Sequence, residues 1–255
     1  MSTTYATSLP RRPKSHGKEP SFTVLEFEPS DPEPSESETS DSETSDRNAS
    51  SPSPLDALPP HDSRFPTLDL SATHLVTSPY PFAENQTHLK PLPLSSRLFS
   101  FALASLAPIR LDYATAPYLS SFDWPLVFAH LRHLCALSAF SWPRTEFYVV
   151  VFRSRLLVTA DRERLGDLDR HSHGEACESG GLLKYWFGEC DEQRKNLATC
   201  LWRSREDAAL GGKGPWHAKA RGAARVMYES ITFETHRFVV EEGAEKWWLE
   251  DVDRR

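Results

Sequence analysis

The sequence predicts an α+β domain, because strand-like and helix-like segments alternate along its second half. Residues 146–153 are aromatic or β-branched almost throughout, as expected of a strand. In residues 181–205, two β-rich runs flank one polar turn, which is typical of a β-hairpin. Helix-like segments lie on both sides of the hairpin, and residues 231–240 alternate as a last strand. This order of strand, helix, strand, strand, helix and strand is the ferredoxin-like plan.

The helices carry start and stop signals. Asp123 and Pro125 fit the cap and first turn of a helix whose apolar residues recur every three or four positions, so this helix should cover a sheet. Asp161 can cap the helix that follows the first strand, and the glycine pair 180–181 can end it. The dipeptide 214–215, Gly-Pro, begins the next helix.

The remaining segments set the expected boundaries. Nearly continuous hydrophobicity predicts that strand 146–153 is central and buried on both faces. We expect a short helix at 97–106, ended by Pro108, and an edge strand at 246–252. The domain should therefore cover residues 63–255, with an extra helical part at about 95–140 and the ferredoxin-like part at about 146–252.

Charge separates an N-terminal tail from this domain. Residues 1–62 hold 12 acidic and 5 basic residues and 10 of the 20 prolines, a composition that predicts disorder. Serines followed by an acidic residue three positions later, at 30, 35 and 40, suit an acid-directed kinase, so we expect regulation by phosphorylation.

The charges of the domain exclude some classes of protein. Residues 63–255 hold 24 acidic and 24 basic residues, which argues against a dedicated nucleic-acid binder. The locally basic segment 203–225 is expected to be a solvated helix face. Neither a secretory segment nor an apolar run of bilayer length is present, so we expect no membrane span and a cytoplasmic protein, with the nucleus as the open alternative.

The sequence contains only weak signals for a metal site or a reactive thiol. Cys135, Cys177, Cys190 and Cys200 form no Cys-x-x-Cys pair and are expected to be free thiols. No nearby acidic or cysteine residue completes a ligand pattern with His130 and His133, so we predict no metal site. We also predict no other cofactor. The glycine-rich segment 211–215 lacks the Lys-Ser/Thr end of a phosphate-binding loop.

Five side chains are candidates for a functional site between the helices and the sheet. His173, His217 and Tyr185 are the catalytic candidates, because two proton-transfer groups beside an aromatic ring suit a phenolic or enolic substrate. Trp202 and Tyr148 are the candidate walls of the ligand pocket. The alternative for each histidine is a hydrogen-bonded structural residue.

Several motifs resemble those of a family of uncharacterised fungal proteins. They are Asp-Tyr-Ala-Thr-Ala-Pro-Tyr at 112–118, Phe-Tyr-Val-Val-Val-Phe-Arg-Ser at 147–154, and the segments 180–188, 196–205 and 214–217. The resemblance runs from about residue 65 to the C-terminus and brings no established reaction. In layout, the second half resembles the dimeric α+β barrel superfamily, which includes cofactor-independent monooxygenases of polyketide biosynthesis.

That resemblance implies a small apolar or aromatic ligand, no cofactor, and a possible homodimer. Two functions follow as alternatives. The first is an oxygenase-like enzyme of secondary metabolism that needs no cofactor. The second is a non-catalytic interaction module that is regulated through its acidic tail.

Overall fold

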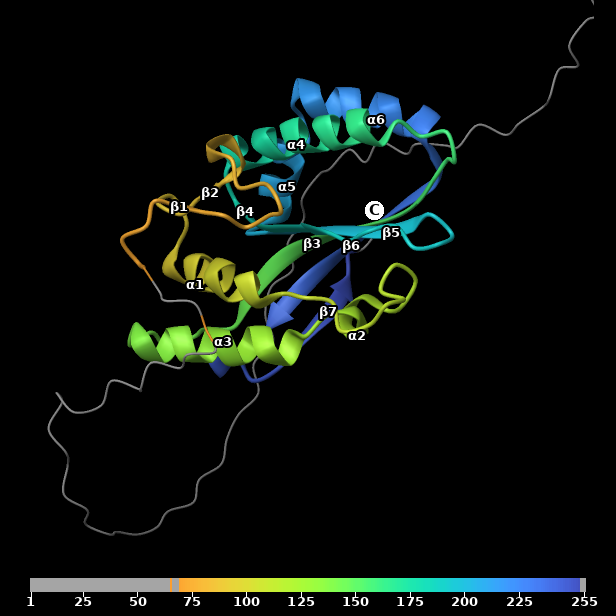
Figure 1. Ribbon diagram of the computed structural model, residues 1–255. Helices are drawn as coiled ribbons and strands as arrows, with labels where there is room; N and C mark the ends of the chain where they lie inside the picture. Colours follow the sequence, from red (N-terminus) through yellow and green to blue (C-terminus); the bar gives the residue numbers. More distant parts are fainter. Residues whose placement is uncertain (1–64, 66–68, 253–255) are drawn as a thin grey trace, which may run out of the picture. The chain divides into compact units, whose positions relative to one another are not determined.

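The ferredoxin-like order predicted from the sequence is confirmed by the computed structural model, which describes Phe65 and residues 69–252. One antiparallel sheet has the strand order β4-β5-β3-β6-β7 (Figure 1). The strands of this sheet and the two helices that connect them are, in chain order, β3 (Thr145–Leu156), α4 (Arg162–Ser179), β4 (Leu182–Phe187), β5 (Lys195–Trp202), α6 (Pro215–Met227), β6 (Tyr228–Val240) and β7 (Trp247–Asp251). Because β5 lies between β3 and β4, and β3 lies between β5 and β6, each helix crosses over one intervening strand. The predicted disorder of residues 1–62 lies outside the described residues.

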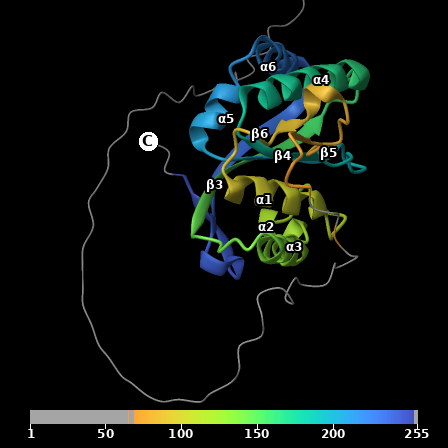
Figure 2. The ribbon, with the colours of Figure 1, turned by 90° about the vertical axis from the view of Figure 1, so that its left-hand side faces the viewer.

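The two faces of the sheet carry different helices. Helices α4 and α6 lie side by side over one face, while helices from the N-terminal half lie over the other (Figures 1 and 2). The latter are α1 (Leu94–Ala102), continued by a 3₁₀ turn (Leu103–Ser105), α2 (Tyr118–Ser121) and α3 (Trp124–Leu137). Helix α2 was not predicted, nor were five other short elements of the described part: β1 (His74–Leu75), a 3₁₀ turn (Ala83–Asn85), β2 (Thr87–His88), α5 (Arg205–Gly211) and a 3₁₀ turn (Glu242–Ala244).

The capping signals act as expected. The side chain of Asp123 accepts a hydrogen bond from Leu126 N at 3.1 Å, and that of Asp161 accepts one from Arg164 N at 3.0 Å. Gly180, at a φ of 84°, follows the last residue of α4. Such a positive φ is strained for residues with a Cβ, so glycine suits this end.

The expectation that β3 is buried on both faces is wrong. Phe147, Val149 and Val151 face α1 and α3 and are at most 3% exposed. The alternate residues Tyr148, Val150 and Phe152 face the α4 and α6 side and stay partly exposed. Successive side chains of a strand point to opposite faces, so the middle of the central strand is sealed on one face at residues 147, 149 and 151 and is not sealed on the other.

The sealed face is packed mainly with aromatic rings. Phe99 of α1 stacks on Phe147 with ring centroids 4.5 Å apart, and Trp124 of α3 lies 4.8 Å from Phe238 of β6. All four residues are at most 3% exposed, and burying each large side chain contributes on the order of 2–3 kcal/mol to folding. This layer fixes the sheet on which the candidate site is built.

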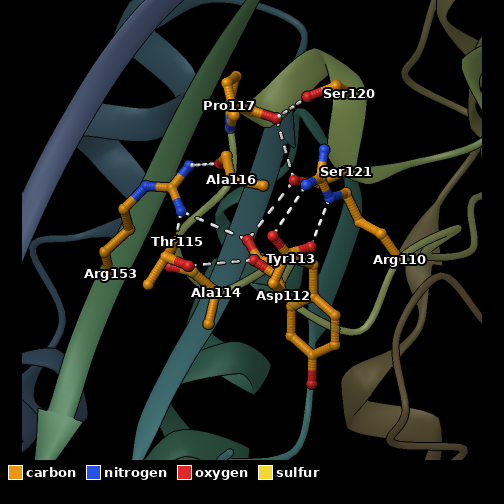
Figure 3. Close-up of polar contacts among 10 residues, drawn as sticks. All are labelled: Arg110, Asp112, Tyr113, Ala114, Thr115, Ala116, Pro117, Ser120, Ser121 and Arg153. Atoms are coloured by element: carbon orange, nitrogen blue, oxygen red, sulfur yellow. Dashed lines mark hydrogen bonds and ion pairs between the residues drawn. The ribbon is translucent and has the colours of Figure 1, made fainter.

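A loop before α2 is held to the sheet by one arginine (Figure 3). Arg153 of β3 donates hydrogen bonds to Ala114 O at 2.7 Å and to Ala116 O at 2.8 Å. Its Nε lies 3.2 Å from Glu234 Oε1 on β6. The motif at 112–118 therefore has a structural partner, because Arg153 satisfies carbonyls that no regular element pairs.

Candidate functional site

Two tyrosines and an aspartate form a hydrogen-bonded cluster between α4 and the sheet. Tyr80 Oη donates to Asp169 Oδ2 at 2.6 Å, and Tyr185 Oη donates to Asp169 Oδ1 at 2.7 Å. Asp169 belongs to α4 and Tyr185 to β4. Tyr80 lies in the segment between β1 and β2, which is fixed to β4 by a hydrogen bond of 3.0 Å from Tyr185 N to Thr77 O. Three separate parts of the chain therefore meet at one carboxyl group.

Removal from water controls the protonation of this cluster. Burial raises the pKa of Asp169 above its ordinary range, although the two phenol hydrogen bonds and the charge of His217 act in the opposite direction. Burial also raises the pKa of Tyr185 and of Tyr80 far above the ordinary value, and the negative charge of Asp169 adds to both shifts. Both phenols therefore keep their protons at neutral pH, and an ionised Asp169 is a stronger base than an exposed carboxylate.

His173 lies one helical turn beyond Asp169 and touches the same cluster. Its ring stacks on Tyr185, with the ring centroids 5.2 Å apart. The side-chain amide of Asn85 lies 2.8 Å from His173 Nδ1, and Cys177 Sγ lies 3.7 Å from Nε2. Burial, and secondly the charge of His217, lower the pKa of His173 to about 4, so its imidazole is neutral at pH 7 and Nδ1 accepts the amide proton.

His217 lies in the first turn of α6, and its hydrogen bond goes to α4. Glu175 Oε2 lies 3.0 Å from His217 Nδ1. The same carboxylate accepts hydrogen bonds from Trp216 N at 2.7 Å and from His217 N at 3.0 Å, and so caps a helix whose N-cap is Gly214. His217 influences the pKa of both Asp169 and His173, so its charge acts on the cluster from the neighbouring helix.

The two expected wall residues lie on the same face of the sheet as Tyr185. Trp202 of β5 is 4% exposed and belongs to the same apolar cluster as Tyr185, against which Tyr148 packs. Trp202 is paired with Tyr148 across β5 and β3. A Cβ on Gly211 of α5 would lie 2.3 Å from the Trp202 ring, so α5 rests directly on this tryptophan.

The five candidates therefore lie on one face of the sheet or on the helices above it, but they do not all contact one another. Tyr185 and His173 are in ring contact. His217 is bonded to Glu175, and the structure gives Tyr148 an apolar contact only. The catalytic and binding roles of all five stay predictions.

The sequence analysis missed Asp169, Tyr80, Glu175 and Asn85. Asp169 had a usable signal, because an acidic residue four positions before His173 lies on the same side of a helix. Glu175 and its partner helix are 40 residues apart in the chain, and the segment with Tyr80 and Asn85 has no regular pattern. Only the fold brings Tyr80, Asn85 and Glu175 to their places in the candidate site.

The described residues also include the cysteines and the histidine pair noted in the sequence. Cys135, Cys177, Cys190 and Cys200 are free, as predicted. Residues 65 and 69–252 hold no group of three or more His, Cys, Asp or Glu side chains placed to bind a metal ion. In that same part of the chain, no helix is long and apolar enough to cross a bilayer. His130 is 2% exposed, its Nδ1 lies 2.9 Å from Ser105 Oγ, and its ring stacks on Phe65.

Comparison with known proteins gives one family and several structures of similar fold. A model of the PB2B2.08-like family matches residues 76–251. The UPF0643 protein PB2B2.08 of Schizosaccharomyces pombe is 35% identical over 178 residues, which are 67% of this chain and 81% of the relative.

Two solved structures illustrate the likeness in fold. SnoaB, a cofactor-independent oxygenase from Streptomyces nogalater, superposes with a TM-score of 0.30 at 10% identity and covers 36% of this chain and 90% of its own. Protein SO0527 from Shewanella oneidensis gives a TM-score of 0.33 at 13% identity, with 37% and 93% covered. Similarity at this level carries no statement about a reaction.

Proposed function

We propose that this chain, which belongs to the PB2B2.08-like family, binds a small apolar or aromatic molecule between the sheet and helices α4 and α6, and moves a proton at Asp169. One observation carries the proposal. A carboxylate with a raised pKa is held by two phenol hydroxyls on the face of the sheet where the central strand is not sealed. Perturbed acids beside partly accessible apolar side chains are typical of functional sites.

The proposed binding surface is apolar and aromatic. Tyr148, Val150 and Phe152 of β3 point toward α4 and α6 and stay partly exposed, although they lie on the central strand. Phe233 of β6 lies opposite Phe152, with ring centroids 5.1 Å apart, and is 47% exposed. Such side chains favour a flat apolar ligand over a charged one, because they offer ring contacts and few polar partners.

The proposed chemistry is proton abstraction. A phenol, an enol or an acidic C–H group of the ligand gives its proton to Asp169, and Tyr80 and Tyr185 stabilise the carboxylate beforehand through their hydrogen bonds. In an oxygenase-like reaction, the resulting carbanion then reacts with dioxygen. A CH₂ carbon becomes C=O, one oxygen atom enters the product, and the other leaves as water with the two hydrogens.

The histidines have different proposed roles. His173 is neutral and stacked on Tyr185, so it positions the phenol and does not carry the proton. His217 and Glu175 form a second proton-transfer pair at the helix layer, and the charge of His217 lowers the pKa of Asp169.

Binding is tested with 2-naphthol, an apolar aromatic phenol, by equilibrium dialysis against the full chain. Val150→Phe fills the proposed surface and should weaken binding by about tenfold or more, which corresponds to about 1.4 kcal/mol. Val158→Phe is the matched control, since Val158 is 80% exposed and lies after the strand. If Val150→Phe folds and binds as the wild type does, the proposed surface is wrong.

The reaction is tested with anthrone, whose CH₂ group is acidic, by following dioxygen uptake. Asp169→Asn should lower the rate by about 10²-fold or more, which is typical of the loss of a general base, while 2-naphthol binding is retained. Tyr80→Phe removes one hydrogen bond to the carboxylate and should have a smaller effect. Binding without dioxygen uptake in the wild type would leave the binding proposal standing and refute the oxygenase step for this probe.

A further inference from the structure

The segment between β1 and β2 lies beside α4 and β4 and is fixed at both ends (Figures 1 and 2). At one end, Thr77 O accepts the hydrogen bond from Tyr185 N, and Thr77 Oγ1 lies 2.7 Å from Thr87 Oγ1. At the other end, Asn85 Nδ2 donates to Arg170 O at 2.9 Å. Thr77, Thr87 and Asn85 are at most 2% exposed, so these ends are firmly anchored.

The middle of this segment, residues 78–84, is held more weakly. Its exposed residues are Pro79, Pro81, Phe82, Ala83 and Glu84. At the rim of α4, Arg170 Nη1 lies 3.6 Å from Glu84 Oε1, and the Arg170 guanidinium lies 5.5 Å from the centroid of the Phe82 ring. Solvent-exposed contacts of this kind contribute little to stability. The contact that reaches deeper is that of Tyr80 with Asp169.

Tyr80 and Tyr185 each hold one oxygen of Asp169, but the two phenols are fixed differently. Tyr185 is 7% exposed on a strand, and its ring stacks on His173. Tyr80 is partly exposed, and its ring centroid lies 5.7 Å from those of His173 and Phe187 in tilted contacts. Of the two phenols, Tyr80 is therefore the one that can leave the carboxylate without disturbing the sheet.

The local sequence keeps the tip of this segment stiff. Residues 78–81 read Ser-Pro-Tyr-Pro, and each proline fixes its own φ and restricts the residue before it to extended conformations. The backbone N–H of Tyr80 also donates to Ser78 Oγ at 3.2 Å. A stiff tip between two anchored ends moves as one piece, so its movement is confined to the residues next to the anchors.

We propose that residues 78–84 form a gate, and that the Tyr80 phenol occupies the position on Asp169 that the hydroxyl of a phenolic or enolic ligand takes. When the ligand binds, its O–H donates to Asp169 Oδ2 in place of Tyr80 Oη, and the Tyr80 hydroxyl turns to water. The inference rests on the function proposed above, because it specifies how the ligand of that same site is recognised.

The exchange selects the class of ligand. One phenol hydrogen bond to the carboxylate is replaced by another, so the buried acceptor keeps a donor. An aromatic molecule without a hydroxyl would displace Tyr80 and leave Asp169 Oδ2 without that donor. The site should therefore prefer a flat ring with a free hydroxyl to the same ring without one.

The gate is within reach of the proposed binding surface. Tyr185, Cys200 and Val150 are direct neighbours across strands β4, β5 and β3, and all three lie on the face toward α4. Adjacent strands are about 4.8 Å apart, so this row is about 10 Å long. A two-ring ligand whose hydroxyl reaches Asp169 therefore extends along the sheet toward Val150.

The first test compares the binding of 2-naphthol to the full-length wild type, Tyr80→Phe and Tyr113→Phe by equilibrium dialysis. Tyr80→Phe removes the hydroxyl that holds the gate closed, so a larger fraction of the protein is open and the apparent affinity should rise by about tenfold. Tyr113→Phe is the matched control, because it loses a hydroxyl that donates to Glu189 O at 2.7 Å, outside the cluster. This control should bind 2-naphthol as the wild type does.

A second ligand tests the exchange of hydroxyls. 2-Methoxynaphthalene has the rings of 2-naphthol but no donor, so the wild type should bind it about tenfold more weakly or worse. Circular dichroism checks that each variant is folded.

The movement of Tyr80 is followed in the wild type itself by ¹⁹F NMR after incorporation of 3-fluorotyrosine. The signal that is absent from Tyr80→Phe identifies Tyr80, and the signal of Tyr113 is assigned in the same way. On saturation with 2-naphthol, the Tyr80 signal should move toward the position of 3-fluorotyrosine in the urea-unfolded chain. The Tyr113 signal should not move.

The possible failures are distinguishable. The gate is overturned if the wild type binds 2-naphthol but Tyr80→Phe binds it no more tightly, or if the Tyr80 signal is unchanged at saturation. Equal affinity for 2-methoxynaphthalene and 2-naphthol overturns the exchange of hydroxyls. If neither the wild type nor Tyr80→Phe binds 2-naphthol, the binding function itself is refuted, and the gate with it.

Discussion

Protonation of His173 should couple the stability of the domain to acid pH. The folded protein holds the pKa of this imidazole at about 4, whereas it is near 6.5 in an unfolded chain. Between pH 6.5 and 4 the unfolded state therefore binds the extra proton and the folded state does not, so stability falls as pH falls through this window. At about 1.4 kcal/mol per pKa unit, the free energy of unfolding should drop by about 3 kcal/mol from this residue.

The assay is urea unfolding of the full chain at a series of pH values, followed by tryptophan fluorescence. His173→Asn keeps an acceptor near Nδ1 for Asn85 but cannot take up the proton. It should lose about 1–2 kcal/mol at pH 7, because the ring contact with Tyr185 is removed, and should then show a flatter pH dependence below pH 6.5.

A second buried histidine tests whether burial is the cause of this effect. His130 is buried with a pKa lowered to about 4, mainly by burial, so His130→Asn should flatten the profile as His173→Asn does. The reasoning about His173 is refuted if His173→Asn loses stability as steeply as the wild type between pH 6.5 and pH 4.

Three substitutions and one alkylation reaction test the local geometry. Arg153→Met should lower the free energy of unfolding by about 2–4 kcal/mol, because it leaves two loop carbonyls and one carboxylate without their donor. Urea unfolding measures this loss, and a loss below about 0.5 kcal/mol would contradict the prediction. Gly222→Ala should raise the melting temperature, because alanine stabilises an open helix position by about 0.5–1 kcal/mol relative to glycine. Gly211→Ala should lower the melting temperature, because the new Cβ would strike a buried tryptophan ring. Burial raises the pKa of Cys177 to about 12, so iodoacetamide should alkylate the more accessible Cys190 first, and equal rates in the folded protein would argue against the packing around α4.

Much of the fold could be predicted because its signals are local. Asp123 and Asp161 cap the helices expected of them, and the hairpin of β4 and β5 lies where its turn was expected. The short helix expected at 97–106 begins earlier, at Leu94, and its α-helical part ends at Ala102, where a 3₁₀ turn follows. Helix α5 was missed because seven residues, two of them acidic, show no periodicity of their own.

Less of the candidate site could be predicted from the sequence. Tyr185 and His173 meet because β4 and α4 are both well-marked elements, and their contact follows from the predicted layout. The central carboxylate of Asp169 was missed among the several acids of this polar helix, although its position one turn before His173 was a usable signal. Tyr80 comes from a segment without regular structure, so nothing in its own neighbourhood placed it there.

By itself, the sequence determined the order of strands and helices and therefore the ferredoxin-like plan, because caps, turns and alternation act between residues close together in the chain. Only the tertiary structure decided that one face of β3 is sealed by α1 and α3 while Tyr148, Val150 and Phe152 stay accessible on the other. All six side chains that alternate along this strand are apolar or aromatic, so their pattern is the same on both faces. The difference between the faces depends on how closely the distant helices approach, and that distance is set by packing across the whole domain.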